Sequence, residues 1–231
     1  LWFSKISQYE DFGHLRTQQQ ADGFCLNLNG QTLNTIRSVA ACGKLFVFTS
    51  GSEWTVSSSG AFSAYNASAF QQSQRGSSRV PALTAGGRVL FVQARGTALR
   101  DFVYDYSTDA YLGDDLTLLA RHLFFNREIQ ALAFQQEPDS LVWCLMGDGR
   151  LLTLTYLPGQ QICAWARQET QGKVLSLCSL PAAGYDEMWF AVKRGSATCI
   201  ERLCPRLSTK NPQDQVFLDS CVSVASLGGE R

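Results

Sequence analysis

The segment Leu45-Phe-Val-Phe-Thr-Ser-Gly51 is the first of four short runs that share an apolar start and a closing glycine. The others are Leu90-Phe-Val-Gln-Ala-Arg-Gly96, Leu141-Val-Trp-Cys-Leu-Met-Gly-Asp-Gly149 and Met188-Trp-Phe-Ala-Val-Lys-Arg-Gly195. Each run is rich in β-branched and aromatic residues and ends in a turn-forming residue, which predicts a strand followed by a tight hairpin. The closing glycines, at 51, 96, 149 and 195, are 45, 53 and 46 residues apart, so the sequence predicts one structural unit repeated four times.

Similar segments flank each run. A weaker apolar stretch with a turn comes before it, as in Ile36-Arg-Ser-Val-Ala-Ala-Cys-Gly43, and an alternating strand follows, as in Arg150-Leu-Leu-Thr-Leu-Thr-Tyr156. A meander of four strands about every 40–50 residues is typical of a β-propeller blade. The sequence therefore predicts an all-β fold, a propeller-like array of about four four-stranded blades with one short helix. A β-sandwich or another all-β fold is the alternative.

The predicted repeats form a single domain over 1–231, in an incomplete propeller. Their expected bounds are 31–78, 79–113, 129–171 and 172–204. Both ends of the sequence resemble strands, at Leu1-Trp-Phe-Ser4 and at Cys221-Val-Ser-Val224, so we expect a piece of a longer protein.

One segment departs from the β pattern, between the second and third repeats. Asp114-Asp-Leu-Thr-Leu-Leu-Ala-Arg-His-Leu-Phe124 places Leu116, Leu119, Ala120 and Leu123 at i, i+3, i+4 and i+7 behind two acidic residues. This spacing predicts an amphipathic connector helix over 114–124, capped by its acidic start.

The middle strands are expected to be buried on both faces, because neighbouring blades cover each other. The side chains predicted to be buried are Phe46, Phe91, Val142, Trp143, Trp189 and Phe190. Cysteines within apolar or alternating stretches are also predicted to be buried and reduced, in a protein made in a cytosol. These are Cys25, Cys42, Cys144, Cys163, Cys178 and Cys199.

Charge and composition argue against several partners. Twenty Lys and Arg residues balance twenty Asp and Glu residues, so the net charge is zero. That balance argues against a dominant electrostatic interaction with nucleic acid or with an anionic membrane. No apolar run approaches the roughly 18 residues that span a bilayer, so no membrane partner is expected.

The sequence predicts no catalytic, cofactor-binding or metal-binding residues. His122 would need an orienting carboxylate and a nucleophile to act as a base, and the sequence places neither. Helix capping and the helix dipole explain Asp114 and Asp115. Asp148-Gly149 and Glu137-Pro-Asp139 are typical of turns. With eight cysteines, two histidines and no Cys-x-x-Cys pair, a zinc site is poorly supplied.

Two other function classes stay open from the residues alone. Five Trp and seven Tyr could build a carbohydrate-binding surface, and carboxylates across a propeller funnel could serve a hydrolase. Ser52-Glu-Trp54 lacks the Ser-x-Asp-x-Gly-x-x-Trp frame of sialidase-like blades, and Asn66-Ala-Ser68 matters as a glycosylation sequon only on a secretory route. Exposed aromatics clustered on one face would favour sugar binding, whereas converging carboxylates with a raised pKa would favour hydrolysis.

An ordered series of segments resembles one family of phage proteins. It begins with Trp2-Phe-Ser-Lys-Ile-Ser-Gln-Tyr-Glu-Asp-Phe12, Ile36-Arg37 and Leu45-Phe-Val-Phe-Thr-Ser-Gly-Ser-Glu-Trp54. The later members are Gln72-Ser-Gln-Arg-Gly-Ser77, Val89-Leu-Phe-Val92, Asp114–Phe124, Gln135-Gln-Glu-Pro-Asp-Ser-Leu-Val-Trp143, Asp148–Tyr156 and Phe217-Leu-Asp-Ser220. Over nearly the whole chain, this series is similar to the tail nozzle, or tail tubular protein B type, proteins of short-tailed phages and prophages. The likeness ends at Cys221 to Arg231, where the family would continue into further strands.

The resemblance implies a non-enzymatic virion structural protein, a subunit of the tail nozzle ring through which viral DNA passes. Such proteins form a hexameric ring below the portal and adaptor. The implied partners are therefore further copies of the chain and the portal or adaptor tail proteins, without sequence-specific nucleic-acid contacts. No catalytic residues are implied. The implied location is the virion tail, after synthesis in the cytoplasm of a bacterial host.

Overall fold

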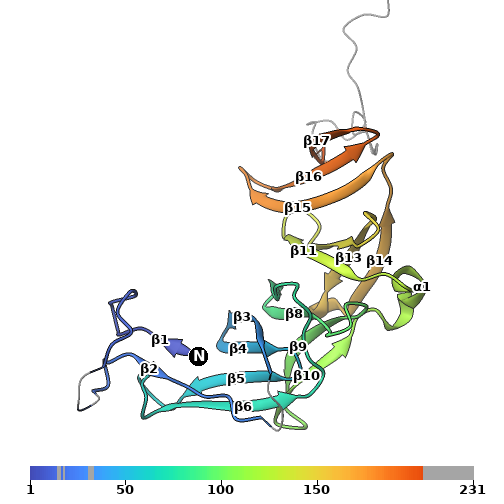
Figure 1. The fold of residues 1–231 in the computed structure, drawn as a ribbon. Coiled ribbons are helices and arrows are strands. Elements are labelled where there is room, and N and C mark those ends of the chain that lie inside the picture. Colours follow the sequence, from blue (N-terminus) through green and yellow to red (C-terminus); the bar gives the residue numbers. More distant parts are fainter. Residues whose placement is uncertain (15–16, 18, 31–33, 205–231) are drawn as a thin grey trace, which may run out of the picture. The chain divides into compact units, whose positions relative to one another are not determined.

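A computed structural model describes residues 1–14, 17, 19–30 and 34–204 of the chain. Two segments named above, Phe217–Ser220 and Cys221–Arg231, lie outside these residues. The described chain is all-β, as the sequence predicted, and consists of propeller-like antiparallel sheets with one short α-helix (Figure 1). By its internal contacts the chain divides into two compact units, residues 1–132 and 133–231.

The first unit contains a four-stranded sheet of β3 (Ile36–Cys42), β4 (Lys44–Thr49), β5 (Glu53–Ser58) and β6 (Ala67–Ser73). Neighbours in sequence are antiparallel neighbours in the sheet, so the sheet is a simple meander (Figure 1). Phe46 and Phe48 of β4 share one face by the alternation of a strand, and Val47 lies on the other. All three side chains are buried.

A second meander follows, with strands β7 (Leu83–Ala85), β8 (Arg88–Val92), β9 (Leu99–Asp105) and β10 (Ala110–Asp115). Aromatic rings join it to the first sheet. The ring centroids of Phe48 and Phe91 are 5.0 Å apart, and those of Phe46 and Phe102 are 5.5 Å apart. These rings belong to one buried cluster with Ala40 and Val89, so the two meanders pack face to face.

The N-terminal segment covers the other face of the first sheet. Its strands β1 (Trp2–Phe3) and β2 (Phe24–Cys25) pair with each other. Leucines beside these strands pack against β4 and β5; the residues of this cluster include Leu1, Leu26, Leu28, Val47, Trp54 and Val56. Because both faces of β4 are covered, its sequence is apolar without alternation.

The second unit repeats the arrangement. A third meander comprises β11 (Ile129–Gln135), which starts before the unit boundary, β12 (Leu141–Met146), β13 (Leu151–Leu157) and β14 (Ile162–Gln168). It is followed by a sheet of β15 (Lys173–Pro181), β16 (Asp186–Arg194) and β17 (Ala197–Arg202). The ring of Trp143 on β12 lies 5.4 Å from that of Phe190 on β16, so these sheets also pack face to face.

The four apolar runs occupy equivalent strands, as predicted, because β4, β8, β12 and β16 are each the second strand of their sheet. Of the six side chains predicted to be buried, five are buried and Trp189 is only partly buried. Alternation places Trp189 on the face opposite Phe190. On that face its indole Nε1 donates to Glu187 at 3.0 Å, and the guanidinium of Arg202 lies 5.8 Å above its ring.

The helix predicted over 114–124 is wrong in its first half. Asp114 and Asp115 belong to β10, where Asp115 pairs with Arg100 of β9. A 3-10 turn (Leu118–Ala120) and the α-helix α1 (Arg121–Phe124) follow. The carboxylate of Asp115 accepts hydrogen bonds from the backbone nitrogen and hydroxyl of Thr117, which forms a turn instead of a helix cap. Leu119, expected on the apolar stripe, is 95% exposed.

The prediction of buried cysteines is wrong for most positions. The described cysteines are free thiols, but among the six named above only Cys144 is buried. Cys42 is partly buried, whereas Cys25, Cys163, Cys178 and Cys199 are exposed. The last three lie on the edge strands β14, β15 and β17, where alternate side chains point into solvent. On the fully covered strand β12, burial raises the pKa of the Cys144 thiol.

Candidate functional site

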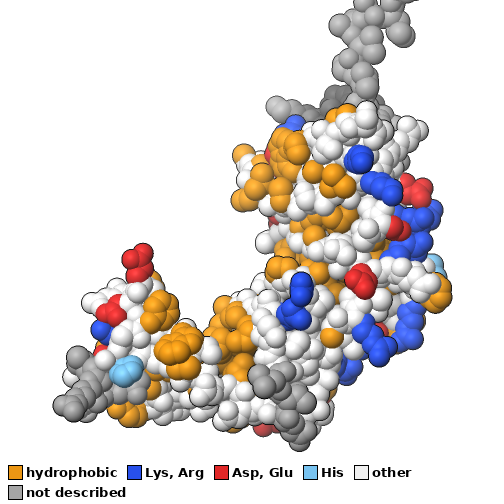
Figure 2. Space-filling model, in the orientation of Figure 1, with side chains coloured by type: hydrophobic (Ala, Val, Ile, Leu, Met, Phe, Trp, Pro, Cys, Tyr) orange, Lys and Arg blue, Asp and Glu red, His pale blue; other side chains and the backbone are white. Residues whose placement is uncertain are grey.

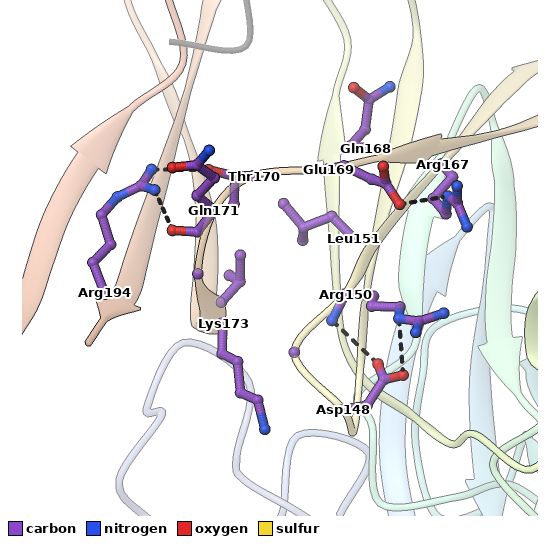
Figure 3. Close-up of a pocket in the computed structure, with 13 residues that line it drawn as sticks. Asp148, Arg150, Leu151, Arg167, Gln168, Glu169, Thr170, Gln171, Lys173 and Arg194 are labelled. Atoms are coloured by element: carbon purple, nitrogen blue, oxygen red, sulfur yellow. Dashed lines mark hydrogen bonds and ion pairs between the residues drawn. The ribbon is translucent and has the colours of Figure 1, made fainter. Parts of the chain in front are cut away.

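A cleft of about 830 Å³ lies at one end of the second unit (Figure 3). Its walls come from the β12–β13 turn (147–150), the link from β14 to β15 (169–172) and the end of β16 at Arg194. In a meander, the turn between the second and third strands and the link to the next sheet emerge at the same end. We call the end formed by 147–150, 167–174 and 192–196 the link edge.

Glycine shapes the wall of this cleft. Gly149 has a φ of +88°, and a Cβ there would lie 2.9 Å from Cβ of Lys173. The backbone nitrogen of Val174 donates to the oxygen of Gly149 at 3.0 Å, which fixes the turn against the link. Asp148-Gly149 is therefore a turn, as the sequence predicted, and only glycine fits its second position without strain.

Charged side chains line the cleft. Nε of Arg150 lies 3.3 Å from a carboxylate oxygen of Asp148, and Nε of Arg167 lies 3.0 Å from one of Glu169. These four side chains are at least one-third exposed. Such surface pairs contribute at most about 1 kcal/mol, so their guanidinium groups can rearrange toward another anion.

Arg194 holds the link in place. Its guanidinium donates to the backbone oxygen of Gln171 and to the hydroxyl of Thr170 (Figure 3). It also forms an ion pair with Glu201. The hydrogen bond to Glu201 raises the pKa of Arg194, and the same bond lowers the pKa of Glu201. Both groups therefore stay charged at neutral pH.

Two lysines face each other at this edge. Lys173 and Lys193 are direct cross-strand partners in the register of β15 and β16, and both are exposed. Partners in an antiparallel pair lie on the same face, and like charges placed directly opposite are unfavourable. Within the described part of the chain neither lysine has an acidic partner within ion-pair distance. Lys173 also lines the cleft.

The first unit has a smaller cleft at the corresponding place. Its volume is about 420 Å³, and its lining includes Ser50 of the β4–β5 turn, Arg79 of the β6–β7 link and Arg95 of the β8–β9 turn. Arg37 and Glu128 are also part of the wall. Each sheet pair thus has a cleft with excess positive charge beside its turns between second and third strands. Guanidinium and ammonium groups in such clefts are suited to bind carboxylates or phosphates.

A buried polar turn lies beside the smaller cleft. In Thr49-Ser-Gly-Ser-Glu-Trp54, the Ser52 hydroxyl accepts hydrogen bonds from Nε1 of Trp54 at 2.8 Å and from Nδ2 of Asn34 at 3.1 Å. The Glu53 side chain is fully buried, and its carboxylate accepts from the Ser73 hydroxyl and the backbone nitrogen of Arg75. The turn is tied to the next link because the backbone nitrogen of Ser77 donates to Thr49 at 2.7 Å.

Two glutamines connect successive sheets. Oε1 of Gln72 on β6 accepts from the backbone nitrogen of Tyr111 on β10 at 2.9 Å, while its Nε2 donates to Thr55. Gln135 on β11 donates from Nε2 to the backbone oxygen of Asp186 on β16 at 2.9 Å, and its Oε1 accepts from the indole of Trp143 at 3.0 Å.

A tyrosine cluster lies at the opposite end of the second sheet. The ring centroid of Tyr104 lies 4.9 Å from that of Tyr106 and 5.3 Å from that of Tyr111. The side chain of Tyr106 is 90% exposed. The ammonium of Lys44 lies 5.3 Å above the ring of Tyr111. The hydroxyl of Tyr104 donates to Asp109, and this bond raises the pKa of Tyr104.

The residues considered from sequence are dispersed. His122 is exposed on α1, and Asp114 is exposed on β10. A carboxylate oxygen of Asp115 lies 3.9 Å from the guanidinium groups of both Arg100 and Arg121, so this carboxylate is paired with arginines. Of the acidic residues of predicted turns, only Asp148 lines the cleft. Glu137 and Asp139 are exposed at the other end of the sheet, in the turn between β11 and β12.

Carboxyl groups with a shifted pKa all shift in one direction. In the described chain these are Asp11, Asp105, Glu187 and Glu201, and the pKa of each is lowered. A general acid needs a raised pKa instead.

No group of three His, Cys, Asp or Glu side chains within the described residues could hold a metal ion. No helix in the described ranges is long and apolar enough to cross a membrane.

Sequence reasoning missed the clefts and the two glutamines. A net charge of zero hides the uneven distribution of charge between the two ends of the second unit. Arg95 and Arg150, each in the turn between the second and third strands of its sheet, were a readable signal. Gln72 and Gln135 give no such signal, because a polar residue at a strand end is ordinary. No protein-family model matches the chain, and comparison with curated proteins gives no match.

Proposed function

We propose that the chain is a non-enzymatic structural subunit of a phage tail nozzle ring. The observation that carries the proposal is the position of the segments that resemble that family. Thr49–Trp54, Gln72–Ser77 and Gln135–Trp143 all supply polar contacts that join one sheet or link to the next. Residues that fix sheets relative to each other suit a protein whose function is geometric.

In this proposal the partners are further copies of the chain, in a hexamer, and the portal or adaptor proteins of the tail. The location is the virion tail. Head-to-tail contacts are required, because a cyclic ring closes only when one face of each subunit meets a different face of the next. The basic clefts of the two units are candidate contact surfaces for acidic partner residues.

Deletion of the gene in its source organism, followed by prophage induction, tests this function. The expected result is particles with heads but incomplete tails, together with immunogold labelling of wild-type tails by antibodies against this chain. Complete tails in the deletion strain, with no label on wild-type tails, would reject the proposal.

Carbohydrate binding is the second candidate, and the tyrosine cluster favours it. Tyr106 is 90% exposed beside Tyr104 and next to Asp105 and Asp109, a combination of ring faces and carboxylates that suits a sugar. Titration with bacterial surface polysaccharides should then show binding that Tyr106→Ala abolishes. Tyr9→Ala, at a tyrosine that is 85% exposed in the N-terminal segment, is the matched control.

A further inference from the structure

The second unit separates its charges between the two ends of its strands. Five of the six Lys and Arg residues in 133–204 lie at the link edge, and Figure 2 shows blue side chains gathered where β14 leads into β15. These five are Arg150, Arg167, Lys173, Lys193 and Arg194. Two acidic residues, Asp148 and Glu169, share that edge, and the carboxylate of Glu201 pairs with Arg194 there.

The opposite end carries the acidic residues. We call it the hairpin edge; it consists of the turn 136–140 between β11 and β12 and the turn 182–187 that leads into β16. Four of the seven Asp and Glu residues in 133–204 lie there: Glu137, Asp139, Asp186 and Glu187. Arg202, at the end of β17, pairs with Glu187 at 2.6 Å.

The two turns of the hairpin edge form one surface. The carboxylate of Asp186 accepts hydrogen bonds from the backbone nitrogens of Gln136 at 2.6 Å and Glu137 at 3.2 Å, and the nitrogen of Asp186 donates back to Glu137. These bonds fix the turn that carries Glu137 and Asp139, and residues 136–139 are all exposed. The hairpin edge is therefore an ordered acidic projection.

The link edge has the complementary form. It is hollow, with a cleft of about 830 Å³, and it holds the unfavourable like-charge pair of Lys173 and Lys193. A carboxylate placed between two such ammonium groups would remove their repulsion. An acidic turn carries the charge that complements this cleft.

We propose that the hairpin edge of one copy of the chain docks in the link-edge cleft of a second copy. Glu137 and Asp139 of one copy then face Lys173 and Lys193 of the next. The two surfaces lie at opposite ends of the same strands, so the contact is heterologous and each copy can bind one neighbour at each end. The inference rests on the proposed function, because a ring subunit needs two different contact surfaces and the inference says which two these are.

Charge reversal of each edge provides the test, measured on the full 231-residue chain by sedimentation velocity at low salt. K173E/K193E makes both edges acidic, and E137K/D139K makes both edges basic. Each variant alone should associate at least about tenfold more weakly than the wild type, because like charges then meet across the contact. An equimolar mixture of the two variants should associate again, since every contact between unlike variants pairs acid with base.

Several controls separate the possible outcomes. Lys44→Glu with Arg121→Glu changes the net charge as K173E/K193E does, but in the first unit, and should leave association unchanged. Glu137→Lys alone replaces the double variant if circular dichroism shows that the latter is unfolded. Wild type that stays monomeric at the highest soluble concentration, or a variant mixture that does not associate, would overturn the proposal.

The test also distinguishes other partners. The wild type could bind a double-stranded DNA oligonucleotide that K173E/K193E does not bind, while the two proteins self-associate equally. In that case the cleft binds phosphate and the proposed contact is wrong. If the wild type associates but the variants do so equally well, these surfaces are wrong while the ring function survives. Gene deletion with normal tails rejects the ring function, whatever the sedimentation result.

Discussion

The side chain of Gln135 donates from Nε2 to the backbone oxygen of Asp186 at 2.9 Å, and so joins β11 to β16 of the following sheet. The other end of the same amide accepts the indole hydrogen of Trp143, whose ring contacts Phe190. One glutamine thus satisfies a buried donor and positions the turn that carries Asp186. In the first unit a glutamine at a different place in the meander, Gln72 on the fourth strand β6, accepts from the backbone nitrogen of Tyr111 on β10.

Gln135→Ala should lower the free energy of unfolding by about 1–3 kcal/mol, because the buried indole nitrogen of Trp143 loses its acceptor. Chemical denaturation followed by tryptophan fluorescence measures the loss. Gln136→Ala is the control: Gln136 is exposed and contributes only its backbone to Asp186, so the change should stay within about 0.5 kcal/mol. Equal losses for both variants would show that Gln135 has no special role.

Trp143→Ala should cost about 3–5 kcal/mol, since a fully covered ring leaves a cavity between two sheets. Trp189→Ala should cost clearly less, because that ring is only partly buried and its partners are in its own sheet. Urea denaturation of both variants compares them directly. A larger loss at Trp189 would mean that the face opposite Phe190 is covered in solution.

Much of the fold could be predicted because its main signal is local. The runs that end at Gly51, Gly96 and Gly149 are apolar without alternation because both faces of β4, β8 and β12 are covered, and that burial leaves a direct trace in the sequence. On β16, before Gly195, only alternate side chains are buried. The cysteines were predicted wrongly because Cys163, Cys178 and Cys199 have apolar neighbours in sequence, as the buried Cys144 does, but lie on edge strands. Burial there depends on what packs against a sheet, which no short window contains.

The candidate site was harder to predict for a similar reason. Arg150, Lys173 and Arg194 are far apart in sequence and meet only because a meander returns to the same end at every second turn. The helix expected at Asp114 failed because strand pairing of Asp115 with Arg100 competes with a local helical pattern. The net charge of zero is correct for the whole chain, but it does not reveal the two ends of opposite charge in the second unit.

Gly76→Ala should destabilise the first unit by more than about 1 kcal/mol. Gly76 has a φ of +74°, and a Cβ there would lie 2.3 Å from the backbone oxygen of Ser50. Gly43→Ala is a matched control, since Gly43 has a φ of +68° but open space around it, so only backbone strain is added. In thermal unfolding, the midpoint temperature of Gly76→Ala should be clearly lower than that of Gly43→Ala. Equal midpoints would show that the β4–β5 turn does not pack against Gly76 as described.

The ion pair of Arg194 and Glu201 should make the stability of the second unit depend on acid. The hydrogen bond from Arg194 lowers the pKa of Glu201 in the folded state, so this carboxylate contributes stability above its unfolded pKa of about 4.3. That contribution is lost as the pH falls through the lower, folded pKa. Glu201→Gln does not titrate, so its deficit relative to the wild type should be present at neutral pH and disappear in acid.

Denaturation of wild type and Glu201→Gln at a series of pH values measures this difference. Arg194→Met removes the partner instead, and in that background Glu201→Gln should have little further effect at any pH, as in a double-mutant cycle. Arg194 also binds Thr170 and Gln171, so Arg194→Met alone should be the more damaging single change. A deficit of Glu201→Gln that stays constant down to strong acid would mean that Glu201 acts through packing, and that the ion pair does not hold the link.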